Sequence, residues 1–209
     1  MSDEIVFYTN PMSRGRIARW MLEEVGQPYR TEILGFDGAM KSDDYKLVNP
    51  MGKVPTIVHG KAVVTECAAI CAYLADAFPS AGLAPDTTAR ADYYRWMFFA
   101  AGPIESAVTN RALGFEVPAG RERMAGYGTF GDVMNTLEMA LRSNPYIAGE
   151  KFTAADVYVG SQVGWGLQFG SIEKRPIFEQ YFGRLALREA YQRAAEKDDA
   201  AVAMLQKAG

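Results

Sequence analysis

The sequence predicts an α/β domain followed by an all-α domain, and three observations support this. Short apolar segments typical of strands alternate with helical patterns up to residue 79. Residues 80–86 then concentrate Pro, Gly and small side chains, as is typical of a boundary between domains. From residue 87 to residue 209 the apolar positions recur with the helical period. We therefore expect domains at 1–79 and 87–209, joined by the linker 80–86.

The first domain is predicted to begin with a strand, a helix and a second strand. Ile5–Tyr8 is a short apolar run, and Arg14–Val25 carries its apolar side chains on one helix face. Tyr29–Leu34 alternates in polarity as a half-buried strand does. Because a helix separates the two strands, we expect them to lie parallel in one sheet, joined by a right-handed crossover.

A hairpin and a further helix complete the predicted first domain. Pro55–Val58 and Lys61–Val64 are apolar runs on either side of Gly60, so they predict two antiparallel strands. A helix over Thr65–Ala77 is expected to end before Phe78-Pro79. We expect the polar residues between the second strand and the hairpin to form a loop. The predicted order is thus β-α-β followed by β-β-α.

The second half of the chain predicts helices only. The expected helices are Thr87–Phe115, Ala119–Ser143, Thr153–Gly170 and two shorter ones from Ile177 to the end. Thr153 and Asp156 match a capping box, in which each side chain bonds the backbone N–H of the other residue. We interpret this pair as a structural feature that starts its helix.

Composition and charge exclude several classes of protein. The chain has 209 residues, of which 49% are hydrophobic and 22% charged, so it can bury enough apolar surface to fold. A net charge of −3 argues against a nucleic-acid surface, which needs an excess of basic residues. The acidic start has no features of a signal or transit peptide, and the longest weakly charged run, 157–172, is too short and polar to span a bilayer. We therefore expect a cytoplasmic protein.

The cysteine and histidine content limits the chemistry. Cys67 and Cys71 lie four positions apart in an apolar helical pattern, where reduced core thiols are expected. The single histidine, His59, lies at the predicted hairpin turn, so we do not expect Ser-His-Asp catalysis. Neither these residues nor any carboxylate cluster has the spacing of a metal site, and we expect no metal.

One motif matches a dinucleotide-binding pattern by its letters alone. Gly126-Tyr127-Gly128-Thr129-Phe130-Gly131 satisfies G-x-G-x-x-G, and Glu150 follows about 20 residues later. The preceding residues 118–125 have a charged, helical pattern, whereas a dinucleotide site needs a strand that places the glycines at a sheet edge. We therefore reject a dinucleotide site here.

Four segments carry a resemblance to a known family. Tyr8-Thr9-Asn10-Pro11-Met12-Ser13-Arg14 precedes a helix, Gly52-Lys53-Val54-Pro55 opens a strand, and Thr65-Glu66 opens the next helix. Together with Phe152-Thr153-Ala154-Ala155-Asp156 in the helical half, their order and spacing resemble the cytosolic glutathione transferases, in a bacterial, serine-type or related branch. The resemblance covers nearly the whole chain. It implies a thioredoxin-like first domain, an all-helical second domain and a homodimer.

The resemblance also implies an activity. Such an enzyme binds glutathione as cosubstrate and transfers its thiolate to electrophilic hydrophobic compounds, a detoxification reaction that needs no metal. Glutathione-dependent isomerisation or dehalogenation is an alternative reaction. A non-catalytic binding or interaction module with the same fold is an alternative of a different class. A thiol-disulfide reductase is not expected, because the first loop has no cysteine.

In this resemblance Ser13 faces the sulfur of glutathione. A thiol with a pKa of about 8.5 is mostly protonated at neutral pH, and the thiolate is the nucleophile. A hydroxyl at the start of a helix can stabilise the thiolate by a hydrogen bond, with help from the helix dipole. Ser13 could instead serve only to cap the helix. Tyr8, Thr9 and Asn10 in the same loop are alternative contacts for the sulfur.

The resemblance places the peptide part of glutathione against two further segments. A cis Val54-Pro55 bond would expose the backbone of Val54, which would pair with the cysteinyl residue of glutathione as an added strand does. Glu66 and Cys67 would bind the γ-glutamyl part of glutathione, with Cys67 at its carboxylate. Cys67 stands where the family has Ser, so we expect its backbone N–H to bind and leave the side-chain bond in doubt. Glu66 could instead serve only to complement the helix dipole.

Two lysines and a set of apolar side chains complete the predicted site. Lys41 and Lys53 would lie near the glycine carboxylate of glutathione, although each could be a solvated surface lysine. The second substrate would bind to apolar side chains near the Ser13 loop, namely Met12, Tyr94, Phe98, Trp165 and Phe169. The aromatic residues of this set could instead belong to the helical core.

Overall fold

The computed structural model describes residues 4–36 and 38–208. They divide into two compact units. Unit 1 takes its described residues from Met1–Ala81 and Arg188–Gly209, and unit 2 is Gly82–Leu187. In the described ranges, none of the helices is long and apolar enough to cross a membrane.

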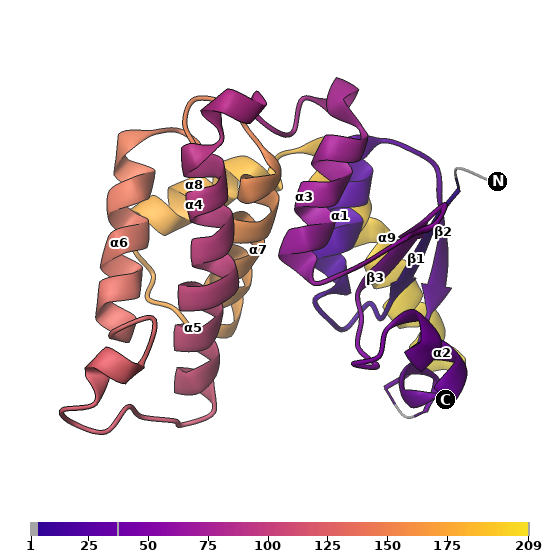
Figure 1. The fold of residues 1–209 in the computed structure, drawn as a ribbon, viewed down its shortest axis with the longest axis horizontal. Helices are drawn as coiled ribbons and strands as arrows, with labels where there is room; N and C mark the ends of the chain where they lie inside the picture. Colours follow the sequence, from indigo (N-terminus) through magenta and orange to yellow (C-terminus); the bar gives the residue numbers. More distant parts are fainter. Residues whose placement is uncertain (1–3, 37, 209) are drawn as a thin grey trace. The chain divides into compact units, whose positions relative to one another are not determined.

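A four-stranded sheet forms the centre of unit 1 (Figure 1). Its strands are β1 (Ile5–Thr9), β2 (Tyr29–Ile33), β3 (Thr56–His59) and β4 (Ala62–Thr65). They lie in the order β2-β1-β3-β4, with β1 and β2 parallel and the other pairs antiparallel. The predicted β-α-β and β-β-α order is therefore confirmed, and with it the thioredoxin-like class of the first domain.

Four α-helices belong to the described part of unit 1: α1 (Gly15–Val25), α2 (Asp43–Val48), α3 (Cys67–Ala77) and α9 (Glu189–Ala208). Helix α1 contacts both α3 and α9, and its apolar face, with Ile17, Met21 and Leu22, is fully buried. The expected loop between β2 and the hairpin is wrong in part, because α2 lies there. Ser42 caps α2 by accepting a hydrogen bond from the N–H of Tyr45.

Helix α9 belongs to unit 1 although it comes last in the chain. Ion pairs join it to α1, namely Arg16–Asp199, Arg19–Asp198, Glu23–Lys197 and Glu23–Arg193, and Arg188 just before α9 pairs with Glu24. Because the partner on α9 comes earlier as the position on α1 advances, the two helices run antiparallel. Our expected division grouped all of 87–209 in one helical domain. The structure differs here, since these long-range charge pairs hold the last helix on α1.

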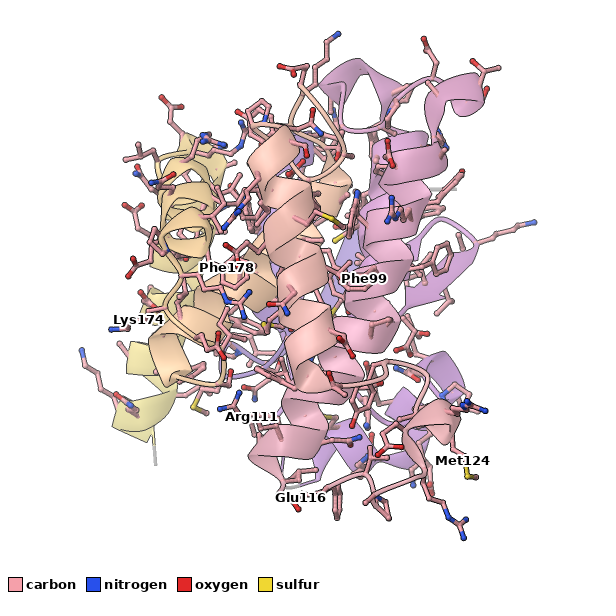
Figure 2. All side chains as sticks on the ribbon, turned by 90° about the vertical axis from the view of Figure 1, so that its left-hand side faces the viewer. Phe99, Arg111, Glu116, Met124, Lys174 and Phe178 are labelled. Atoms are coloured by element: carbon pink, nitrogen blue, oxygen red, sulfur yellow. The ribbon has the colours of Figure 1, made fainter. Side chains whose placement is uncertain are left out.

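Unit 2 is helical throughout its regular structure. Its helices are α4 (Ala91–Phe99), α5 (Glu105–Ala112), α6 (Phe130–Ser143), α7 (Ala154–Phe169) and α8 (Pro176–Ala186). A π-helical turn at Ala100–Ile104 joins α4 to α5, and it contains Pro103, which lacks the N–H of a regular helix. Phe178 of α8 is fully buried, whereas Met124 is exposed on the connection between α5 and α6 (Figure 2).

The helix expected over Ala119–Ser143 is shorter than its pattern indicated. Only Phe130–Ser143 is α-helical, and a short 3-10 turn at Glu122–Met124 precedes it. Gly120 and Gly128 adopt left-handed backbone angles, with φ of 79° and 68°, which end a right-handed helix. Thr129 and Asp132 then form a capping box that starts α6. The glycines of the G-x-G-x-x-G match therefore lie in a helix start and not after a strand.

The predicted capping box of α7 is confirmed and centres on a buried carboxylate. Asp156 accepts hydrogen bonds from the backbone N–H of Thr153 (2.9 Å) and of Ile147 (2.8 Å). The hydroxyl of Tyr181 donates to the same carboxylate at 2.9 Å. Burial raises the pKa of Asp156 to about 6, and these donors oppose that increase. The native state therefore binds this proton more tightly than an unfolded chain does.

Removal of Asp198 should destabilise the protein strongly. The side chains of Arg19 and Asp198 are only 5% and 1% exposed and meet at 2.7 Å. In Asp198→Ala the guanidinium of Arg19 would stay buried without its carboxylate, so urea unfolding should show a loss of about 3–5 kcal/mol. Glu196→Gln changes an exposed acid on the same helix and should cost less than about 0.5 kcal/mol. Equal losses in the two variants would contradict the importance of the buried pair.

Asp156→Ala should lower stability by an amount that depends on pH. At pH 7 the free energy of unfolding should fall by about 2–4 kcal/mol, because buried donors lose their acceptor. The native pKa of about 6 exceeds the usual 3.8, so the stabilisation by the proton is complete below pH 4 and lost as pH rises through 6. The difference in the free energy of unfolding between wild type and variant should thus increase by up to about 3 kcal/mol from pH 7 to pH 4. Urea unfolding at both pH values measures it, and a gap that narrows would contradict the raised pKa.

Candidate functional site

One row of residues across the sheet brings the predicted site segments together. In the strand register Tyr8 lies opposite Thr56, and Thr56 lies opposite Thr65. The loop with Ser13 follows the first of these residues, Val54-Pro55 precedes the second, and Glu66 follows the third. The three segments therefore meet at one end of the sheet.

Ser13 lies at the turn that starts α1 and makes two local hydrogen bonds. Its hydroxyl donates to the carbonyl of Asn10 at 2.7 Å, and its Oγ accepts from the N–H of Gly15 at 2.9 Å. The side chain therefore does bond an N–H of the first helical turn, as in the capping alternative. It is also half-buried and so partly accessible. To donate to a ligand the hydroxyl must rotate away from Asn10, whose carbonyl would keep the backbone N–H of Ser13 at 3.1 Å.

The three alternative sulfur contacts differ in exposure. Thr9 and Asn10 are buried, with 0% and 2% of their surface exposed. The amide of Asn10 already donates to the carbonyl of Leu34 at 2.8 Å and accepts from the N–H of Met12 at 2.9 Å. Tyr8 is half-buried, and its ring lies 5.4 Å from the ring of Tyr45. Of these three residues, Tyr8 is the one with side-chain surface left for a ligand.

Arg16 supports the Ser13 loop from the other side. Its Nε donates to the carbonyl of Pro11 at 2.6 Å, and its guanidinium also pairs with Asp199 of α9 at 2.7 Å. Arg16 thus fixes the loop, and Asp199 balances its charge. The sequence did not indicate that a residue of the last helix takes part in holding this loop.

A buried polar cluster fixes the backbone before Val54. Tyr45 Oη donates to the carbonyl of Lys53 at 2.7 Å, and Asn49 Nδ2 donates to the same carbonyl at 2.8 Å. Both side chains also contact Thr56 Oγ1, at 2.9 and 3.1 Å. Burial raises the pKa of Tyr45 above its usual value, so its hydroxyl stays protonated and can donate. The Val54-Pro55 bond is cis, as expected.

The sequence analysis missed Tyr45 and Asn49 because it treated their helix as a loop. The sequence does contain signals for this helix. Ser42 is a favoured N-cap residue, two acidic residues follow it in the first turn, and Pro50 comes just after the helix. These are start and stop signals of a short helix, and they would have placed Tyr45 on it.

Lys41 lies beside Gly52 and holds the loop that leads to Val54. Its Nζ donates to the carbonyls of Met51 (3.1 Å) and Gly52 (2.7 Å), which leaves one of its three N–H donors for another acceptor. Gly52 has a φ of 55°, and a Cβ there would lie 2.8 Å from the carbonyl oxygen of Met40. Lys53 is exposed on the same loop. The structure thus brings the two predicted lysines together.

Glu66 and Cys67 form the start of α3 at the same end of the sheet. Glu66 is the N-cap, and its φ of 64° is the single positive value among the described non-glycine residues. Such backbone strain is typical of functional sites, where the surrounding structure maintains it. Cys67 is buried, and its Sγ lies 3.5 Å from the carbonyl oxygen of Arg14. This contact links the start of α3 directly to the start of α1.

The predicted second-substrate residues are distributed over both units. In unit 1, Met12 is 59% exposed. In unit 2, Tyr94 and Phe98 lie one turn apart on α4, with ring centroids 6.5 Å apart, and both are exposed. Trp165 and Phe169 are one turn apart on α7, which packs against α4, and Phe169 is 75% exposed. Exposure weighs against the core alternative for Tyr94 and Phe98, and a role of these residues in binding the second substrate stays a prediction.

The histidine and the second cysteine lie in surroundings that indicate a structural role. His59 ends β3, and its Nδ1 lies 2.9 Å from the hydroxyl of Tyr73, away from the row that carries Ser13. Cys71 is fully buried, and burial raises the pKa of its thiol well above the usual value. Among residues 4–36 and 38–208, no group of three or more His, Cys, Asp or Glu side chains could hold a metal ion.

Comparisons with known proteins identify the relatives of the chain. Residues 12–77 match the family model described as "Glutathione S-transferase, N-terminal domain". The chain is 30% identical to glutathione S-transferase A of Pleuronectes platessa over 181 residues, which are 80% of each protein. It is 29% identical to glutathione S-transferase GST-4.5 of Xanthomonas campestris over 147 residues, which are 66% of this chain and 72% of that relative.

Solved structures agree with these relatives. A glutathione transferase of Methylococcus capsulatus superimposes with a TM-score of 0.77 at 25% identity, over 94% of this chain and 99% of the other. A Sulfitobacter homologue with bound glutathione has the same fold, with a TM-score of 0.75 at 24% identity, over 94% and 99% of the two chains. The chain therefore belongs to the glutathione S-transferase family.

Proposed function

We propose that the chain is a glutathione transferase that binds glutathione in unit 1 and transfers its thiolate to electrophilic hydrophobic compounds. The single observation that carries the proposal is the row Tyr8–Thr56–Thr65. Its residues adjoin a serine at a helix start, the backbone segment before β3 and a second helix start, all at one end of the sheet. These are the groups that a tripeptide with a thiol and two carboxylates requires.

The backbone of Val54 would bind the middle of the tripeptide. Val54 precedes β3, so its N–H and C=O could pair with the cysteinyl residue of glutathione as a short added strand. Tyr45 and Asn49 donate hydrogen bonds to the neighbouring carbonyl of Lys53, which keeps the backbone before β3 in place before the ligand arrives. A preformed binding segment reduces the entropy lost on binding.

Positive groups would bind the two carboxylates of glutathione. The N-cap side chain of α3, within the described chain, accepts no hydrogen bond from the first turn, so the N–H groups at Cys67 and Ala68 can face the γ-glutamyl carboxylate. The glycine carboxylate would lie near Lys53 and near the remaining donor of Lys41. Glu66 would accept a hydrogen bond from the amino group of the ligand.

Ser13 would stabilise the thiolate. To lower a thiol pKa by about two requires roughly 2.7 kcal/mol of preference for the anion. A helix N-terminus supplies about 0.3–1 kcal/mol, so α1 alone is insufficient. A hydroxyl that donates to a charged acceptor supplies about 1.5–3 kcal/mol more. Ser13 at the start of α1 therefore completes the required stabilisation, once its hydroxyl rotates from the Asn10 carbonyl to the sulfur.

The second substrate, the oligomer and the location are part of the same proposal. An apolar electrophile would bind exposed apolar side chains such as Met12, and positioning beside the thiolate would supply much of the rate. Family membership supports a homodimer. The composition and net charge of the chain support a cytoplasmic location.

Ser13→Ala should impair turnover far more than folding. Loss of the hydrogen bond to the thiolate should raise the pKa of bound glutathione by about 1–2 and lower kcat/KM at neutral pH roughly 10- to 100-fold. The pH profile of conjugation with a chromogenic aryl halide measures both. Ser80→Ala, an exposed serine in unit 1, should leave the profile unchanged.

The outcomes separate the alternatives for this site. Unchanged turnover in Ser13→Ala would move the sulfur contact to Tyr8. Glutathione binding without conjugation of the aryl halide or other electrophiles would favour the binding module. The absence of glutathione binding in a calorimetric titration would contradict the proposal as a whole.

Lys53→Ala should weaken glutathione binding without a change in the chemical step. The ammonium group is exposed, so its attraction to the glycine carboxylate is worth up to about 1 kcal/mol, and KM for glutathione should rise roughly fivefold at constant kcat. Lys61→Ala, an exposed lysine at the β3–β4 turn, is the matched control and should leave KM unchanged. An equal effect of both variants would show that only the net charge of unit 1 matters.

A further inference from the structure

A buried hydroxyl next to the site has no hydrogen-bond partner. Thr9 is 0% exposed, and its Oγ1 bonds to no atom of the described residues. An unpaired polar atom in a protein interior costs stability, so it calls for an explanation such as an enclosed water or a role in the chemistry. Thr9 ends β1 and immediately precedes the loop that carries Ser13. Its position makes a role in the chemistry the explanation to test.

The hydroxyls of Thr9 and Ser13 approach the same point in the first turn of α1. A Cβ on Gly15 would lie 2.0 Å from Thr9 Oγ1 and 3.1 Å from Ser13 Oγ. The two oxygens are therefore no more than about 5 Å apart. Because Gly15 has no side chain, nothing from residue 15 separates them. Any larger residue there would displace the Thr9 hydroxyl, whose β-branched side chain is stiff.

The hydrogen bonds of Ser13 leave room for one more donor. A serine oxygen has one proton to donate and two lone pairs that accept. Ser13 Oγ now gives its proton to Asn10 and accepts from the N–H of Gly15, which leaves one lone pair open. Thr9 has a proton that no described acceptor takes. A side-chain rotation that brings the two oxygens, now at most about 5 Å apart, to hydrogen-bond distance would let Thr9 donate to Ser13.

We propose that Thr9 is a positioning residue that donates its hydroxyl proton to Ser13 Oγ when Ser13 donates to the thiolate of glutathione. The proposal rests on the function proposed above. A hydroxyl that accepts a hydrogen bond becomes a stronger donor, so the pair Thr9–Ser13 would hold the thiolate better than Ser13 alone. Thr9 acts through Ser13 and does not itself contact the sulfur, which agrees with its complete burial.

Thr9→Val tests the proposal, because valine has the same shape without the hydroxyl. Removal of an unpaired buried hydroxyl should leave the melting temperature unchanged or raise it. The pKa of glutathione bound to the variant, from the pH profile of aryl halide conjugation and from thiolate absorbance, should nevertheless rise by roughly 0.3–0.6. This corresponds to about a two- to fourfold loss of kcat/KM below that pKa. Thr9→Ser, which keeps the hydroxyl, should retain the wild-type pKa.

Double variants identify the route by which Thr9 acts. In a Ser13→Ala background, Thr9→Val should cause no further rise of the pKa, because the acceptor of its hydrogen bond is gone. An unchanged pKa in Thr9→Val, or the same rise in both backgrounds, would overturn the proposal and leave an enclosed water as the partner of Thr9. If Thr9→Val does not fold, Thr9→Ala removes the same hydroxyl and must show the same rise. If glutathione bound to the wild-type protein shows no thiolate absorbance, the function proposed above is refuted instead.

Discussion

The register of β3 between β1 and β4 is the constraint on which the rest of the site depends. It sets Thr56 opposite Tyr8 on one side and opposite Thr65 on the other. A slip of one residue would turn every side chain of β3 to the other face of the sheet and would move Val54 away from the start of α1. The fully buried Phe7 and Ile57, which are paired across β1 and β3, oppose such a slip. Core packing thus fixes the geometry of the polar site.

Polar contacts outside the sheet hold the three site segments in place. Tyr45 and Asn49 hold the backbone before β3 at Lys53. Lys41 holds the loop at Gly52, and Arg16 holds the loop before Ser13. These residues use backbone carbonyls as acceptors, so they fix the path of the chain beside the starts of α1 and β3. The starts of α1 and α3 lie next to each other, since Cys67 Sγ is 3.5 Å from the carbonyl oxygen of Arg14, and a helix N-terminus favours an anion. This arrangement suits a thiolate and a carboxylate on the same small molecule.

The sequence alone predicted the order of strands and helices along the first domain and most of the helices, because their apolar periods are clear. Ile5–Thr9 and Gly15–Val25 lie within a residue or two of the predicted bounds. The helix predicted from Ala119 was too long. Gly120 and Gly128 interrupt it with left-handed backbone angles, which an apolar period does not reveal. The packing of α9 on α1 was not predictable in this way. Pairs such as Arg19–Asp198 join residues far apart in the chain, and periodicity carries no information on such pairs.

The candidate site was predictable as a set of segments but not in its hydrogen bonds. The motif around Ser13 indicated the right helix start, yet the present bond of Ser13 to Asn10 and the orphan hydroxyl of Thr9 appear only in three dimensions. A crystal structure of the protein with glutathione tests the central claim most directly. We expect the cysteinyl backbone of glutathione to pair with Val54 and its sulfur to lie within hydrogen-bond distance of Ser13 Oγ. A sulfur directed away from the start of α1, or a tripeptide bound elsewhere, would contradict it.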